Sequence, residues 1–82
     1  MEYYVYILKS EIDGRLYKGH TSNIEKRVEE HNFGMTKSTK GYRPWSLVYF
    51  EKFQTRDEAI EREKYYKTGI GREFIKNLLN NK

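Results

Sequence analysis

The chain contains no cysteine, which excludes a disulfide framework and a thiolate metal site. It also has no apolar run near the length of a membrane span, and no basic segment precedes the strand-like residues that begin at Tyr3. We therefore expect a soluble, cytoplasmic protein whose stability comes from packing alone. A chain of 82 residues has room for one small domain, so we expect residues 1–82 to fold as a unit.

Acidic residues are too few to balance the basic ones. The chain has 12 Asp and Glu against 16 Lys and Arg, which gives a formal net charge of +4. A basic chain favours an anionic partner, and nucleic acid is the commonest one. Charge alone does not decide the matter, because many small basic domains bind nothing in particular.

Hydrophobic periodicity and turn residues predict three strands and three helices. Residues 3–10 have apolar groups on both faces, and the Asp13-Gly14 pair after them favours a hairpin with residues 16–20. Ser22 and Thr55 are each followed three residues later by Glu, a capping-box pattern that predicts a helix start. The expected elements are strands at 3–10, 16–20 and 46–53, a helix beginning near Asn23, a loop at 32–42, a helix from 55 to about 68 that is stopped by Gly69 and Gly71, and a terminal helix from about 72 to 80.

The hairpin brings two tyrosines to one face of the predicted sheet. If the Asp13-Gly14 pair forms the centre of the turn, Tyr6 faces Thr21, and Tyr17 projects from the same face as Tyr6. Gly19 lies between them and leaves space for a close approach to the backbone. From the pattern alone, such a pair of tyrosines is usually cross-strand packing.

Three polar side chains fall where the helical pattern expects apolar ones. Arg27 and His31 are four residues apart beside the apolar ridge of the first helix, so both point toward the edge of the core. Glu63 lies inside the apolar stripe of the second helix, where an ionised carboxylate is costly unless it is paired or bound to a metal. Without other information, a structural ion pair with a Lys or Arg is the favoured interpretation of Glu63.

The loop at 32–42 is rich in basic and hydroxyl side chains. We call Lys37, Lys40 and Arg43, which lie in and just beyond it, the basic loop residues. One interpretation is a solvated, mobile connection. The other is a loop that contacts phosphates and positions a nucleic-acid backbone without reading its sequence.

These residues occur in an order that resembles the GIY-YIG nucleases, in particular their small single-domain members. Tyr4-Val5-Tyr6 stands where the first motif of that family would be, and Tyr17-Lys18-Gly19 stands where the second would be. Arg27, His31 and Glu63 follow at matching places on the two helices. The resemblance covers nearly the whole chain, and five matches in order are far more specific than any one of them.

The sequence departs from the family pattern at three positions. Tyr4 replaces the glycine of the first motif, and Lys18 replaces the apolar middle residue of the second. Neither is a group that the family uses for chemistry. His20 stands where repair-type relatives have a lysine, so the resemblance implies a nucleic-acid-binding position there, in addition to the basic loop residues.

The resemblance implies an α+β fold, with a small, mainly antiparallel three-stranded sheet flanked by helices. It further implies a metal-dependent endonuclease that hydrolyses phosphodiester bonds of nucleic acid, expected to be DNA, with one Mg²⁺ or Mn²⁺. Tyr17 would take the proton of the attacking water, Tyr6 would orient water or phosphate, and His31 would relay the proton from Tyr17. Arg27 would stabilise the scissile phosphate, and Glu63 would anchor the metal.

Two further functions remain open from the sequence. A non-catalytic nucleic-acid-binding module could have the same fold and basic surface, and it would tolerate loss of Glu63 and of divalent metal. A protein-interaction domain that uses a surface around Trp45 and Tyr49 is the third reading.

Overall fold

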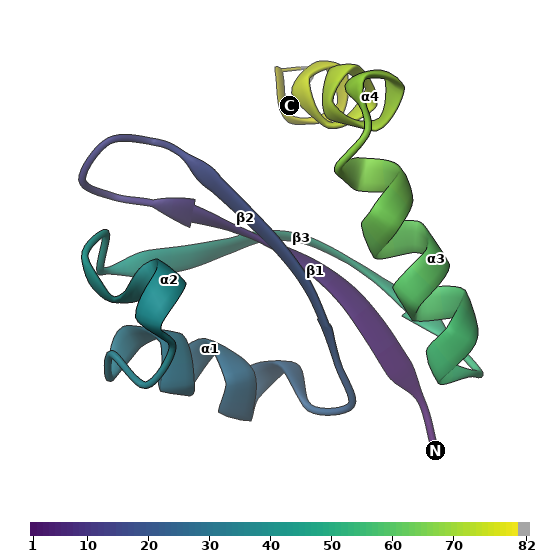
Figure 1. The fold of residues 1–82 in the computed structure, drawn as a ribbon, viewed down its shortest axis with the longest axis horizontal. Coiled ribbons are helices and arrows are strands. Elements are labelled where there is room, and N and C mark those ends of the chain that lie inside the picture. The colour runs from purple at the N-terminus through teal and green to yellow at the C-terminus, as the bar shows by residue number, and fades with distance from the viewer. Residues whose placement is uncertain (81–82) are drawn as a thin grey trace.

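The computed structural model describes residues 1–80 and has three strands and four helices in that range. The sheet is antiparallel throughout, with the strand order β2-β1-β3, so the predicted α+β architecture is confirmed (Figure 1). No helix in residues 1–80 is both long and apolar enough to cross a membrane. The elements are β1 (Tyr3–Ser10), β2 (Leu16–Thr21), α1 (Ile24–Asn32), α2 (Lys37–Lys40), β3 (Trp45–Phe53), α3 (Arg56–Tyr66) and α4 (Gly69–Asn80).

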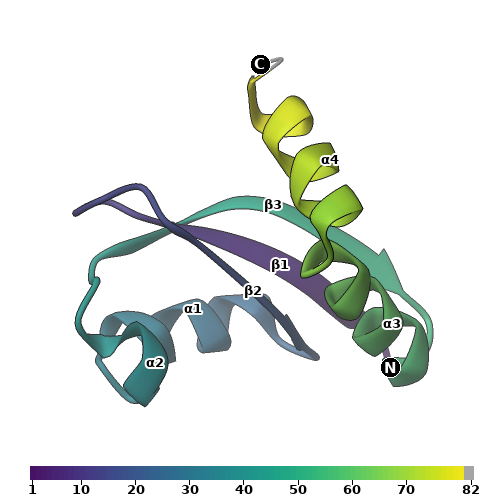
Figure 2. The ribbon, with the colours of Figure 1, turned by 45° about the horizontal axis from the view of Figure 1, so that its top comes forward.

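The central strand β1 is buried on both faces, as its composition predicts. Val5 and Ile7 point into a core formed with α3 and α4, whereas Tyr6 and Leu8 point into a second core on the side of α1. All four side chains are at most 1% exposed. Figure 2 shows α1 and α2 together on one side of the sheet and α3 and α4 on the other. The sheet therefore separates two small cores.

The hairpin register differs from the expected one by two residues. Tyr6 pairs with Gly19, so the predicted pairing of Tyr6 with Thr21 is wrong. The cause is a longer turn, in which Gly14 takes a φ of +77° that favours glycine. A shift of two residues leaves every side chain on its expected face. Tyr6 and Tyr17 therefore share a face, and their ring centroids lie 6.2 Å apart.

The first helix begins one residue later than the capping-box pattern predicts. The side chain of Asn23, not that of Ser22, accepts the hydrogen bond from the Lys26 amide at 3.1 Å, and α1 starts at Ile24. The predicted capping box at the start of α3 is confirmed, because the Thr55 and Glu58 side chains each bind the other's backbone amide.

The junction of α3 and α4 corrects the predicted role of the two glycines. Gly69 and Gly71 do not stop α3, which ends at Tyr66, but form the first turn of α4. The Thr68 hydroxyl accepts a hydrogen bond from the Gly71 amide at 3.0 Å, so the Thr68 side chain caps the start of α4. A Cβ at Gly71 would collide with the Tyr65 carbonyl, because α4 begins directly against the end of α3.

Candidate active site

A buried chain of hydrogen bonds links β1, α1 and α2. The Tyr6 hydroxyl lies 2.9 Å from His31 Nε2, and His31 Nδ1 lies 2.8 Å from the Thr39 hydroxyl. His31 and Thr39 are 0% exposed and Tyr6 is 1% exposed. The Tyr17 ring packs against the same imidazole, with 4.8 Å between centroids. The expectation that Tyr6, Tyr17 and His31 come together is thus met by direct contacts.

The direction of these hydrogen bonds follows from the last member of the chain. The Thr39 hydroxyl donates to the Thr36 carbonyl at 3.3 Å, so its oxygen accepts from His31 Nδ1–H. His31 Nε2 then has the lone pair and accepts from the Tyr6 hydroxyl. Burial, with the nearby charge of Arg27, lowers the pKa of His31, which favours the neutral imidazole over the charged form.

Tyr6 is a hydrogen-bond donor and not a base in this arrangement. Burial raises the pKa of Tyr6 to about 12, although hydrogen bonding by Arg27 opposes the rise. Both ring nitrogens of His31 are already engaged, by Tyr6 and by Thr39. A direct proton relay from Tyr17 to His31 would therefore require the imidazole to give up one of these partners.

Gly19 allows both tyrosine rings to lie over β2. A Cβ at this position would be 2.5 Å from the Tyr6 hydroxyl oxygen and 3.1 Å from the Tyr17 ring. The sequence indicates that Gly19 leaves room near the backbone, and the structure shows that the Tyr6 hydroxyl occupies this room. Any larger residue would displace the hydrogen-bonded end of Tyr6.

A polar cleft of about 530 Å³ opens beside this cluster, between the start of α1 and the start of α3. Lys26, Arg27 and Arg56 supply three permanent positive charges, and Glu30 is the one carboxylate in its lining. Arg27 Nη1 donates to Glu30 at 2.9 Å, which holds the guanidinium at the edge of the cleft. Such a surface suits a phosphate group.

Two of the cationic lining residues were not found by the sequence analysis. Lys26 lies in the first turn of α1, and Arg56 is the first residue of α3. Arg56 reaches the cleft from the far side, and its guanidinium lies 5.4 Å from the Tyr3 ring. The only available signal was their position beside a helix start, which is too general to single them out.

Glu63 lies in an ion-pair cluster. One carboxylate oxygen is 2.6 Å from His20 Nδ1 and the other is 2.6 Å from Lys67 Nζ, and the side chain is 18% exposed. The ion pair with a lysine that the pattern favours is therefore present. Burial raises the pKa of Glu63, but the hydrogen bonds from Lys67 and His20 outweigh it and hold the pKa below its ordinary value. The carboxylate is anionic at neutral pH.

Glu63 as a single carboxylate ligand fits a hard cation that is bound weakly, and it does not fit a site in which several protein ligands enclose the metal. Within residues 1–80 no three His, Asp or Glu side chains gather into a metal-binding cluster. Glu63 would be a lone protein ligand, which suits Mg²⁺ because that ion retains several waters and shares substrate oxygens. His20, expected to contact nucleic acid, lines the polar cleft while its Nδ1 is engaged by Glu63.

The segment expected to be a loop at 32–42 contains the short helix α2 and is held at several points. Asn32 bonds both backbone groups of Trp45, at 2.6 and 3.0 Å, and the Trp45 indole donates to the Thr39 carbonyl at 2.8 Å. The Ser10 hydroxyl donates to the Tyr42 carbonyl at 2.7 Å. The segment is therefore largely exposed but fixed by side-chain hydrogen bonds, and it places Thr39 against His31.

The basic loop residues lie on the outside of this segment. Lys37 and Lys40 are exposed, and Arg43 is partly buried, with its Nε donating to the Lys40 carbonyl at 2.8 Å. A Cβ at Gly34 would be 2.6 Å from the Arg43 guanidinium, so the guanidinium packs closely over that glycine. The two lysines are thus free to meet a ligand in solution, whereas Arg43 also has a structural role.

A second polar cluster lies on the other side of the sheet. Glu51 accepts hydrogen bonds from Arg62 Nε at 2.9 Å and from the hydroxyls of Tyr66 and Tyr49 at 2.8 and 2.9 Å. Burial raises the pKa of Glu51, but these donors outweigh it and lower the pKa overall. The sequence gives no sign of this cluster, because its members come from strand and helix positions far apart in the chain. It joins β3 to α3 away from the polar cleft.

Comparison with known proteins identifies the family of the chain. The family model described as the GIY-YIG catalytic domain matches residues 2–74. A UPF0213 protein of Staphylococcus saprophyticus is 48% identical over 68 residues, which cover 82% of each chain. A UPF0213 protein of Clostridium perfringens is 52% identical over 65 residues, covering 78% of this chain and 69% of the relative. The solution structure of a UPF0213 protein from Bacillus halodurans matches with a TM-score of 0.58 and 33% identity, over 95% of this chain and 85% of the other.

Proposed function

Because the chain belongs to the GIY-YIG family, which is of nuclease type, we propose that it is a divalent-metal-dependent endonuclease that hydrolyses phosphodiester bonds of DNA. The observation that supports this most is the buried chain from Tyr6 through His31 to Thr39, set beside a cleft with three permanent cations. Phosphodiester hydrolysis needs a deprotonated water and stabilisation of the charge that develops on the phosphate. In this proposal the cluster of tyrosines around His31 serves the deprotonation of water, and the cationic cleft stabilises the charge on the phosphate.

The tyrosines have different roles in this proposal. Tyr6 keeps its proton, because its pKa is about 12 and its hydroxyl donates to His31. Its remaining lone pair can accept a hydrogen bond and orient water or a phosphate-bound group. Tyr17 is half-buried against the His31 ring and takes the proton of the attacking water. Arg27 stabilises the scissile phosphate by charged hydrogen bonds from the cleft edge.

Glu63 is the residue proposed to hold one Mg²⁺ or Mn²⁺. When bound, such an ion supplies positive charge to the phosphate and to the leaving oxygen. His20 and Lys67 keep the carboxylate ionised and oriented. Lys67 can be displaced from Glu63 by a metal ion, because the Lys67 side chain is 53% exposed and can turn into solvent.

The test is cleavage of labelled single-stranded, duplex and branched DNA and RNA, with and without Mg²⁺ or Mn²⁺. We expect Glu63→Gln, which keeps size and shape, to lower divalent-dependent cleavage by orders of magnitude while the fold survives. Glu61→Gln is the matched control, because Glu61 lies on the same helix but is exposed. A parental cleavage rate in Glu63→Gln, in protein free of contaminating nuclease, would exclude the metal role.

One observation favours a second function, a non-catalytic nucleic-acid-binding module. Both oxygens of Glu63 are already paired, so the carboxylate has a structural role without any metal. A binding module predicts that affinity for nucleic acid is indifferent to divalent metal and that no substrate is cleaved. Absence of cleavage of every substrate by the parental protein, together with binding, would decide for this second function.

A further inference from the structure

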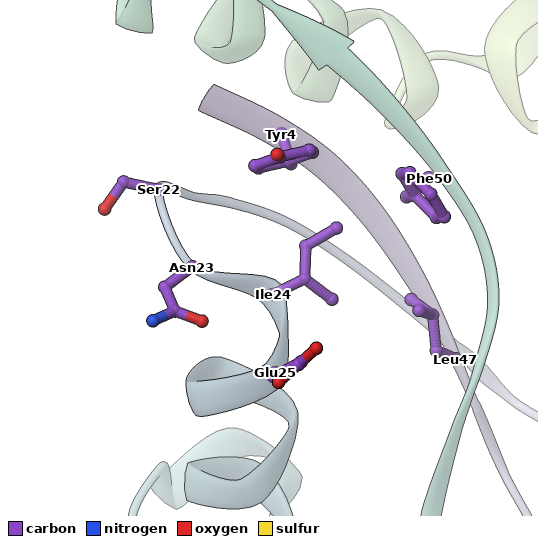
Figure 3. Close-up of a pocket in the computed structure, with 7 residues that line it drawn as sticks. All are labelled: Tyr4, Ser22, Asn23, Ile24, Glu25, Leu47 and Phe50. Atoms are coloured by element: carbon purple, nitrogen blue, oxygen red, sulfur yellow. The ribbon is translucent and has the colours of Figure 1, made fainter. Parts of the chain in front are cut away.

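An apolar groove of about 380 Å³ lies on the α1 side of the sheet, between the start of α1 and β3. Its walls are the side chains of Tyr4, Ile24, Leu47 and Phe50, which face one another across the groove in Figure 3. Leu47 is 39% exposed and Phe50 is 52% exposed. The volume is within the range of pockets that hold small ligands, about 300–1,000 Å³.

An irregularity in the sheet gathers these side chains on one face. The pairing of β3 with β1 shifts between Ile7 and Leu8, so that Phe50 pairs with Tyr6 while Leu47 pairs with Leu8. In a regular strand, residues three apart point to opposite faces. The extra residue of the shift turns Leu47 to the same face as Phe50, as β-bulges do when they re-aim a side chain.

The groove adjoins the polar cleft of the candidate active site. Ser22 and Asn23 line both of them. On one side of these two residues the surface has the cations Lys26, Arg27 and Arg56. On the other side it is mainly aromatic and aliphatic, with the Glu25 carboxylate as its one charged group. A ligand that fits both parts must have an anionic group directly beside a flat apolar group.

We propose that this groove binds the base of an unpaired nucleotide next to the phosphate held in the cleft. The inference rests on the proposed function, since it needs nucleic acid in the cleft, and it names the substrate class: strands with at least one unstacked base. Aromatic side chains such as Tyr4 and Phe50, whose rings lie 6.1 Å apart edge to face, offer stacking surface that accepts any base. Bases within an intact duplex have both faces covered and cannot enter.

A second copy of this chain or an apolar peptide fits the observations less well. Either would bury apolar surface in the groove but leave the adjoining cations without a partner. A nucleotide satisfies both at once, because its phosphate is anionic and its base is flat and weakly polar on its faces.

The test measures binding, in EDTA so that no strand is cut. Fluorescence anisotropy compares a labelled single-stranded oligothymidylate, the same oligomer with abasic sites throughout its centre, and a blunt duplex. We expect Phe50→Ala and Phe50→Leu to weaken binding of the base-bearing single strand about tenfold and to change binding of the abasic strand and the duplex little. Phe33→Ala is the matched control, because Phe33 is 75% exposed and outside the groove. Thermal melting checks that each variant is folded.

The possible outcomes separate this inference from the proposed function. Equal losses for base-bearing and abasic strands, or no loss in either Phe50 variant, would overturn the base-binding groove even if the parental protein cleaves DNA. A Phe50-dependent change of oligomeric state without a change in base discrimination would also overturn it and assign the groove to a second copy. Base-dependent binding in a protein that cleaves nothing would support the groove while the endonuclease proposal fails.

Discussion

Replacing Gly19 with alanine tests how the two tyrosines are positioned. The added Cβ would lie 2.5 Å from the Tyr6 hydroxyl oxygen, 2.7 Å from Tyr6 Cζ and 3.1 Å from the Tyr17 ring. Comfortable contacts between such atoms are about 3.5 Å or longer, so one of the groups must move by about 1 Å. Tyr6 is 1% exposed and its hydroxyl is held by His31 at 2.9 Å, so no open space is available for this movement.

The size of the effect follows from these contacts. Overpacking of a well-filled core costs about 1–3 kcal/mol, and loss of the Tyr6–His31 hydrogen bond adds about 1 kcal/mol. For a domain of this size, each kcal/mol lowers Tm by about 4–8 °C. Displacement of a substrate-positioning group by about 1 Å lowers the rate by roughly 100-fold. We therefore expect Gly19→Ala to fold with a lower Tm and to lose most of its cleavage activity.

Circular dichroism melting and a cleavage assay at a temperature well below the lower Tm measure the two effects separately. Gly41→Ala is the control, because a Cβ at Gly41 would have no heavy atom within 4 Å. It should match the parental protein in both assays. If Gly19→Ala retained both the parental Tm and the parental rate, Gly19 would not be required for the position of the Tyr6 hydroxyl.

Three further predictions concern the surroundings of the site. Thr39→Val should leave His31 Nδ1–H unpaired and lower the free energy of unfolding by about 1–3 kcal/mol, whereas Thr39→Ser should keep the parental value. Urea denaturation and imidazole ¹⁵N chemical shifts measure these effects, and equal stability of the two variants would contradict the prediction. Because burial lowers the pKa of folded His31, the unfolded chain binds the proton first, so stability should fall as pH drops below about 6.5, and this component should vanish in His31→Gln. Replacing all three basic loop residues with alanine should make the slope of log affinity for DNA against log salt concentration shallower, by the equivalent of up to about three phosphate contacts. An unchanged slope would exclude the loop from the interface.

The sequence predicts those features of the site that depend on local periodicity. Alternation in β1 places Tyr6 toward α1, and the spacing on α1 places Arg27 and His31 beside the core. Glu63 is conspicuous because a carboxylate interrupts an apolar stripe. These patterns persist whatever the rest of the chain does, because they follow from the geometry of single strands and helices.

Features that depend on long-range contacts could not be predicted in the same way. The hairpin register depends on the length of the turn, which two residues such as Asp13-Gly14 do not determine alone. His20 and Glu63 are 43 residues apart, and no periodicity connects them. Thr39 looks like one of several loop hydroxyls until the fold places it against the His31 ring.

The hydrogen bonds around α2 form a closed ring with a consequence for local opening. Thr39 holds His31, Trp45 holds the Thr39 carbonyl, and Asn32, the residue after His31, holds both backbone groups of Trp45. The segment at 33–44 cannot lift away without breaking the support of the imidazole. We therefore expect hydrogen exchange at the Trp45 indole to accompany loss of the Tyr6 contact with His31. We also expect any opening of this ring to disrupt the site, because it removes the support of His31 and with it the Tyr6 contact.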